Sequence, residues 1–190
     1  MEYRLDKTGL WDILEGWSPY ATRKIRLVAC GGTALTIQDL KPSTKDVDFI
    51  VPVEDEYKAL ITMIRRLGYE LRTGTGWSRG DAYIFDLFCG NKVYVTELLE
   101  SPLDEGNHIP IKDFGKISVA ALNDYDLIAT KMFRGTDVDV DDCTRLIRAR
   151  GKTFDLERLQ ERYREMAGYD LQPERMMKNL QYLLDGLKEG

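Results

Sequence analysis

The stretch that decides the fold is residues 28–49, VACGGTALTIQDLKPSTKDVDF. The apolar run that ends at Cys30 is typical of a buried strand, and Gly31-Gly32 interrupts it. Residues 33–40 have the spacing of a short helix, and a polar loop containing a proline prevents the helix from continuing. The apolar run at residues 47–53 predicts a second strand. Strand, glycine turn, helix and strand in this order predict an α/β fold.

The remaining elements follow from the period of the apolar residues and the breaks between them. We expect helices at residues 8–20 and 54–67, and extended segments at 69–71, 82–89, 92–97 and 108–120. The glycine-rich loop 73–80 lacks the lysine and hydroxyl residue of a P-loop, so we interpret it as a hairpin connection. Further helices are expected at 124–133, 141–149, 155–166 and 173–187. The sequence therefore predicts a small mixed sheet with flanking helices over residues 1–120, and a helical part over residues 121–190 packed on this core.

Three aspartates carry the main functional signal. Asp46 and Asp48 lie two residues apart at the start of a predicted strand. Because side chains alternate between the faces of a strand, both carboxylates should lie on one face, about 7 Å apart. Asp86 lies inside an otherwise apolar strand, where a carboxylate without a partner is costly. If the two strands are neighbours, all three residues are candidate catalytic residues and ligands of Mg²⁺ or Mn²⁺.

The glycine turn supplies the second half of the signal. Gly31 and Gly32 lie where a strand gives way to a helix. Backbone N–H groups and the positive end of a helix attract phosphate at such a turn, and a side chain would obstruct the approach. Two cations about 3.5–4 Å apart clamp the attacking and leaving oxygens of a phosphoryl group. The sequence therefore predicts an enzyme that handles a nucleoside triphosphate with divalent metal.

Composition and residue spacing argue against several other classes of protein and of binding site. The formal net charge of −5 argues against a broadly basic nucleic-acid-binding protein. No apolar run approaches the roughly 20 residues of a membrane helix, and the first residues lack the signal-peptide pattern, so we expect a cytoplasmic protein. The three cysteines are widely spaced, and His108 lies in a loop-like stretch, which disfavours cysteine catalysis and a histidine ligand. The acidic segment 137–142 lacks the glycine and glutamate that a calcium-binding EF-hand needs.

Residues 28–35 and 42–49 together resemble the nucleotidyltransferase superfamily of DNA polymerase β, and they are most similar to its small prokaryotic branch of AbiEii-type proteins. That family has a glycine turn, a D-x-D pair and a third acid on a later strand. The matching positions here are Gly31, Gly32, Asp46, Asp48 and Asp86. Thr33 replaces a serine that many relatives carry. The resemblance covers about residues 25–150.

Residues 124–135 also resemble a downstream helix of that branch. Lys131, Asp139 and Asp142 occupy its lysine and acid positions, and Val138 stands where the branch often has a basic residue. The resemblance implies that Lys131 contacts the nucleotide together with the glycine turn and Thr33. From the residues alone, Lys131 could pair with the β- or γ-phosphate or neutralise one of the two acids on the next helix.

The function that the resemblance implies is metal-dependent transfer of a nucleoside monophosphate from a triphosphate to an acceptor, which is an RNA, a protein or a small molecule. It also implies a toxin–antitoxin or phage-defence context. A haloacid-dehalogenase-type phosphatase is disfavoured, because its D-x-D follows an apolar strand whereas Asp46 and Asp48 precede one. The main alternative is a non-catalytic module on the same fold that binds a nucleotide or a partner protein.

Overall fold

A seven-stranded mixed sheet forms the centre of the protein, in the order β3-β4-β5-β2-β1-β9-β8. The structure is a computed structural model that describes residues 4–80 and 83–188. The strands of the sheet are β1 (Ile25–Ala29), β2 (Asp46–Val51), β3 (Glu70–Leu71), β4 (Gly76–Ser78), β5 (Ile84–Cys89), β8 (His108–Asp113) and β9 (Ile117–Leu122). β1 runs antiparallel to β2 and parallel to β9, and β2 runs parallel to β5. The predicted mixed α/β fold is confirmed.

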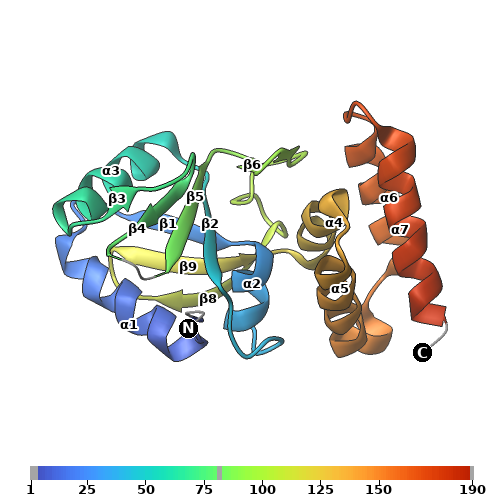
Figure 1. The fold of residues 1–190 in the computed structure, drawn as a ribbon, viewed down its shortest axis with the longest axis horizontal. Coiled ribbons are helices and arrows are strands. Elements are labelled where there is room, and N and C mark those ends of the chain that lie inside the picture. Colours follow the sequence, from blue (N-terminus) through green and yellow to red (C-terminus); the bar gives the residue numbers. More distant parts are fainter. Residues whose placement is uncertain (1–3, 81–82, 189–190) are drawn as a thin grey trace.

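Two helices cover one face of the sheet. They are α1 (Lys7–Trp17), followed by the 3₁₀ turn η1 (Ser18–Tyr20), and α3 (Glu54–Arg66), and both lie on the side away from the C-terminal helices (Figure 1). Trp17 of α1 packs on Phe85 of β5 and on Tyr69, with ring centroids 4.9 and 5.3 Å apart. Burial of these large rings anchors α1 to the centre of the sheet.

Helices make up the rest of the chain after β9. They are α4 (Asp124–Arg134), α5 (Asp137–Arg150), the 3₁₀ turn η2 (Gly151–Thr153), α6 (Leu156–Ala167) and α7 (Pro173–Lys188). The short helix α2 (Gly31–Ile37) contacts β2 on one side and α4 and α5 on the other, and so joins the sheet to the helical part (Figure 1). The predicted helical C-terminal part is confirmed. Its boundary as a separate domain near residue 120 stays a prediction.

Several elements differ from the sequence-based expectation. Residues 92–97 are a hairpin rather than one strand, because Tyr94 and Val95 form a turn between β6 (Lys92–Val93) and β7 (Thr96–Glu97). Helix α5 begins four residues earlier than expected, because Thr136 and Asp139 form a capping box. His108 belongs to β8 instead of a loop. Within the described residues, no helix is both long enough and apolar enough to span a membrane.

Candidate active site

The three aspartates lie on the same face of the sheet. In the parallel ladder of β2 and β5, Asp48 is the direct partner of Asp86, and Asp46 lies two positions before Asp48. Phe85 packs on Trp17, so this residue points towards α1 and its neighbour Asp86 points to the opposite face. Paired residues of neighbouring strands share a face. The sequence makes a shared site depend on the two strands being neighbours, and the strand of Asp86 does lie beside the strand of Asp46 and Asp48.

Asp48 is the most constrained of the three. Its side chain is almost fully buried, and its Oδ1 accepts a 2.8 Å hydrogen bond from the hydroxyl of Tyr94. Burial raises the pKa of Asp48 to about 6, and repulsion from Asp86 and Asp46 adds to the rise, whereas the Tyr94 hydrogen bond opposes it. Asp48 is therefore a carboxylate whose negative charge the protein alone stabilises poorly.

Asp86 and Asp46 have different surroundings. The Oδ1 of Asp86 accepts a 2.7 Å hydrogen bond from the hydroxyl of Thr75. Burial raises the pKa of Asp86, and the Thr75 hydrogen bond opposes this rise. Asp46 is exposed at the start of β2. The three aspartates thus range from buried to exposed.

These carboxylates do not form a complete metal site by themselves. Among residues 4–80 and 83–188, no group of three or more His, Cys, Asp or Glu side chains is arranged so that it could hold a metal ion. Hydroxyl groups occupy one oxygen of Asp48 and one of Asp86. Mg²⁺ is, however, usually held by one or two carboxylates together with substrate phosphates. The hard oxygen donors of Asp46 and Asp48 on one face fit a divalent cation that arrives with a triphosphate.

The glycine turn lies directly against these acids. Helix α2 begins at Gly31, which has φ of +55°, and a Cβ added there would overlap Oδ2 of Asp48. A Cβ added at Gly32 would lie 2.7 Å from the hydroxyl oxygen of Thr44. Thr33 is fully buried, and its hydroxyl accepts a 2.9 Å hydrogen bond from the backbone N–H of Asp48. The glycines therefore allow close packing of α2 on β2, and Thr33 fixes the backbone of β2.

A cluster of ion pairs stands across from the acids, on α4 and α5. Lys131 is almost fully buried, and its Nζ lies 2.8 Å from Oδ2 of Asp142. Lys41 donates to both oxygens of Asp142 at 3.0 Å. Arg134 binds Asp139 through two hydrogen bonds of 2.8 and 2.6 Å. Of the two alternatives for Lys131, the structure contains the ion pair with the neighbouring helix.

Sequence reasoning misses parts of this cluster. It gives no functional interpretation for Lys41 or Tyr94. The pattern of a threonine three residues before an acid, Thr136 to Asp139, indicates the helix start that places Asp139 beside Arg134. No local pattern indicates Lys41, because its partner Asp142 is 101 residues away in the chain.

One cavity of about 450 Å³ joins the glycine turn, the acids and the ion pairs. Gly31, Gly32, Asp46, Asp48 and Lys131 all line it, whereas Asp86 and the buried Thr33 do not. Further lining residues carry positive charge: Arg4, Lys41, Lys45 and Arg134. Acids and cations therefore line the same cavity, Asp142 included, and this combination suits a metal-bound polyphosphate.

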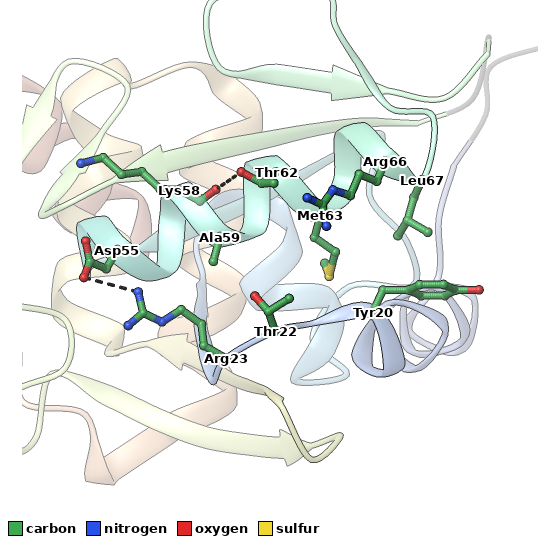
Figure 2. Close-up of a pocket in the computed structure, with 10 residues that line it drawn as sticks. All are labelled: Tyr20, Thr22, Arg23, Asp55, Lys58, Ala59, Thr62, Met63, Arg66 and Leu67. Carbon is green, nitrogen blue, oxygen red and sulfur yellow. Dashed lines mark hydrogen bonds and ion pairs between the residues drawn. The ribbon is translucent and has the colours of Figure 1, made fainter.

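A larger cavity of about 850 Å³ lies elsewhere, between α3 and the segment after η1 (Figure 2). Figure 2 shows Arg23 turned towards Asp55, to which it is ion-paired at 3.4 Å. Lys58 is likewise paired with Glu54 at 2.6 Å. This cavity contains none of the predicted site residues and lies on the α3 side of the sheet, so we place the candidate active site in the smaller cavity.

Comparison with solved structures shows which fold this geometry belongs to. The crystal structure of ANT(2″)-Ia in complex with adenylyl-2″-tobramycin matches with a TM-score of 0.58 at 15% sequence identity, covering 84% of this chain and 97% of that chain. The solution structure of ANT(2″)-Ia, an antibiotic-resistance factor, matches with a TM-score of 0.57 at 15% identity, covering 85% and 94%. At this identity the likeness concerns the fold. No curated protein sequence matches the chain.

Sequence-family comparison supplies the identity. The family described as "Nucleotidyltransferase of unknown function (DUF6036)" matches residues 15–189, which is nearly the whole chain. The resemblance to nucleotidyltransferases is thereby confirmed, whereas the AbiEii-type branch stays a prediction. The chain belongs to the nucleotidyltransferase family of unknown function DUF6036.

Proposed function

We propose that the protein transfers a nucleoside monophosphate from a nucleoside triphosphate to an acceptor, with Mg²⁺ or Mn²⁺ as cofactor. The observation that carries this proposal is that acids and cations line the same 450 Å³ cavity. Asp46 and Asp48 line it together with cations that include Lys41 and Lys131. A triphosphate needs both, because the basic groups neutralise its oxygens while the acids hold its metal ion.

The three aspartates have two separate roles in the proposed transfer. The acceptor oxygen forms a bond to the α-phosphorus, the bond from that phosphorus to the bridging oxygen breaks, and pyrophosphate leaves. We assign the proton of the acceptor hydroxyl to Asp86, which does not line the cavity but is the strand partner of Asp48, so the acceptor would lie beside the cavity at β5. Its raised pKa makes Asp86 a better base than an exposed aspartate. Asp46 and Asp48 would hold the divalent cation, which supplies charge neutralisation of the phosphate oxygens.

The nucleotide end of the site rests on the glycine turn and the basic cluster. Gly31 and Gly32 line the cavity at the start of α2, where backbone N–H groups have no partner within the helix. In this proposal these groups and Lys131 contact the triphosphate, while Thr33 acts through the backbone of Asp48. Asp142 is shared by Lys41 and Lys131, and Asp139 lies beside Lys131 and Arg134, so the three cations of this cluster exceed its two acids by one positive charge.

Small molecules, RNA and proteins are the candidate acceptors. The fold is shared with ANT(2″)-Ia, whose crystal structure contains adenylyl-2″-tobramycin, which makes aminoglycosides such as tobramycin one small-molecule acceptor to test. Proteins and tRNA are further acceptors to test, and the resemblance to AbiEii-type proteins adds a toxin–antitoxin or defence role. A non-catalytic nucleotide-binding module is the second candidate. It is favoured by one observation, because the hydroxyl of Tyr94 occupies one oxygen of Asp48, a carboxylate that a catalytic metal ion would need.

The test is incubation with each of the four triphosphates labelled at the α-phosphate, with Mn²⁺ and with tRNA, protein or aminoglycoside acceptors. The proposal expects label on an acceptor from an α-labelled triphosphate and none from a γ-labelled one. Asp48→Asn should abolish transfer, whereas Asp12→Asn, an exposed aspartate on α1, should not change it. Tight triphosphate binding without transfer to any acceptor would favour the non-catalytic module.

A further inference from the structure

The hairpin of β6 and β7 contains an unusual turn. Lys92 pairs with Glu97 and Val93 with Thr96, so Tyr94 and Val95 are the two residues of the turn. Two-residue turns of this kind favour Asn-Gly or Gly-containing pairs, because at least one residue must adopt positive φ. Here Tyr94 adopts φ of +52°, a conformation that a bulky side chain rarely takes. Its side-chain contacts must therefore hold the turn in this shape.

Those contacts are made with Asp48 of the candidate active site and with the neighbouring strand β5. The Tyr94 hydroxyl donates its 2.8 Å hydrogen bond to Oδ1 of Asp48, and its ring packs on Phe88 of β5 at a centroid distance of 4.7 Å. Tyr94 is nevertheless 47% exposed, and Val95 is 87% exposed. The tip of the hairpin is therefore a surface element that reaches the carboxylate through one side chain. Strained residues at such positions are a known feature of switch regions and ligand clamps.

The hydrogen bond engages one of the two carboxylate oxygens of Asp48, Oδ1. Its other oxygen, Oδ2, packs against Gly31, where even a Cβ would overlap it. Asp48 and Tyr94 both line the 450 Å³ cavity. A divalent cation that binds Asp48 through Oδ1 therefore competes with the Tyr94 hydroxyl for that oxygen.

We propose that Tyr94 is a latch on the metal-binding carboxylate: it holds Oδ1 of Asp48 while no cation is bound, and the hairpin releases it when a cation with its triphosphate enters. This inference rests on the proposed function for the cation itself. The latch lowers the affinity for a cation alone, because only the released state is competent to bind. A metal-bound triphosphate brings additional contacts with the basic cluster and can drive the release.

The first test compares Mn²⁺ affinity in the full chain, measured at pH 8 by the electron paramagnetic resonance signal of free Mn²⁺. Tyr94→Phe keeps the ring on Phe88 and removes the hydroxyl, so it should bind Mn²⁺ about tenfold more tightly than wild type, the scale of one hydrogen bond to a charged group. Tyr169→Phe, an exposed tyrosine near the end of α6, should bind as wild type does. In an Asp48→Asn background, Tyr94→Phe should have no effect.

The outcomes separate the latch from the proposed function. Equal or weaker Mn²⁺ binding by folded Tyr94→Phe would overturn the latch and leave the metal site standing. No Mn²⁺ binding by either protein, with or without an unreactive triphosphate, would overturn both. Circular dichroism and urea denaturation establish that each variant is folded.

The second test follows the hairpin directly. A fluorophore is attached at Val95→Cys in a Cys89→Ser background, because Cys89 is exposed whereas Cys30 and Cys143 are buried. Mg²⁺ with an unreactive triphosphate should change the emission of the label, and Asp48→Asn should abolish the change. An unchanged signal under conditions where the triphosphate is bound would show that the hairpin stays in place, and would overturn the latch.

Discussion

Asp48→Asn should make the metal-free protein more stable, and the gain should depend on pH. Asp48 is almost fully buried, and its pKa is raised from 3.8 to about 6. Folding therefore favours the protonated form, so the stability contributed by this group is greatest below pH 4 and is lost as pH rises through 6. Asparagine has nearly the same shape, stays neutral and can still accept the Tyr94 hydrogen bond.

The size of the gain follows from the same shift. Each pKa unit corresponds to about 1.4 kcal/mol, so the ionised Asp48 costs the folded state about 3 kcal/mol at pH 8. At pH 5 the carboxyl is still largely protonated in the folded protein, and the cost is about 1.5 kcal/mol. For a chain of this length, the difference at pH 8 corresponds to about 6–12 °C in Tm.

The assay is urea denaturation of wild type and Asp48→Asn at pH 5 and pH 8, in the presence of a chelator. Asp12→Asn is the matched control, because Asp12 is exposed, and its stability should follow wild type at both pH values. Adding Mn²⁺ at pH 8 should narrow the gap, because the cation stabilises only the protein that has the carboxylate. The reasoning is refuted if Asp48→Asn is less stable than wild type at pH 8, or if the gap is the same at both pH values.

Two further substitutions probe the rest of the cavity. Lys131→Met leaves Asp142 with one of its two lysine partners, so the free energy of unfolding measured by urea denaturation should fall by about 1–3 kcal/mol. Lys178 is exposed, so Lys178→Met should leave the free energy of unfolding unchanged. Equal stability of the two variants would mean that Lys131 is not a structural partner of Asp142. Gly32→Ala places a Cβ against a neighbouring threonine hydroxyl and should weaken triphosphate binding in calorimetry, by about tenfold. Gly16→Ala, which meets no atom within 4 Å, is its control, and unchanged affinity in Gly32→Ala would remove the glycine turn from the site.

Much of the sheet can be predicted because its strands carry strong local signals. The apolar runs that form β2 and β5 are bounded by proline and glycine, and Asp86 is informative because it is the single acid in its run. Strand alternation alone then places Asp46 and Asp48 on one face. The pairing of β2 with β5 could only be assumed from the sequence, because the order of strands in a sheet depends on contacts between residues far apart in the chain.

The contacts of the site are less predictable, for two physical reasons. Ion pairs such as Lys41–Asp142 join residues far apart in sequence, and nothing local distinguishes their members from solvated charges. The Tyr94 turn contradicts local turn preferences, since tertiary contacts with Asp48 and Phe88 hold it in place. A β-like run with a tyrosine at its centre is therefore interpreted as one strand, although the chain reverses there.

The measurement that tests the central claim most directly is calorimetric titration of the wild-type protein with each nucleoside triphosphate in the presence of Mg²⁺. The account predicts saturable binding of at least one triphosphate, with a Kd of about 1 μM to 1 mM, the range in which KM values of enzymes usually lie. Binding should be lost in the Asp46→Asn/Asp48→Asn double variant and should weaken when Mg²⁺ is removed. If the folded wild-type protein binds none of the four, or if the double variant binds as tightly as wild type, the cavity between β2 and α4 is not a metal–triphosphate site.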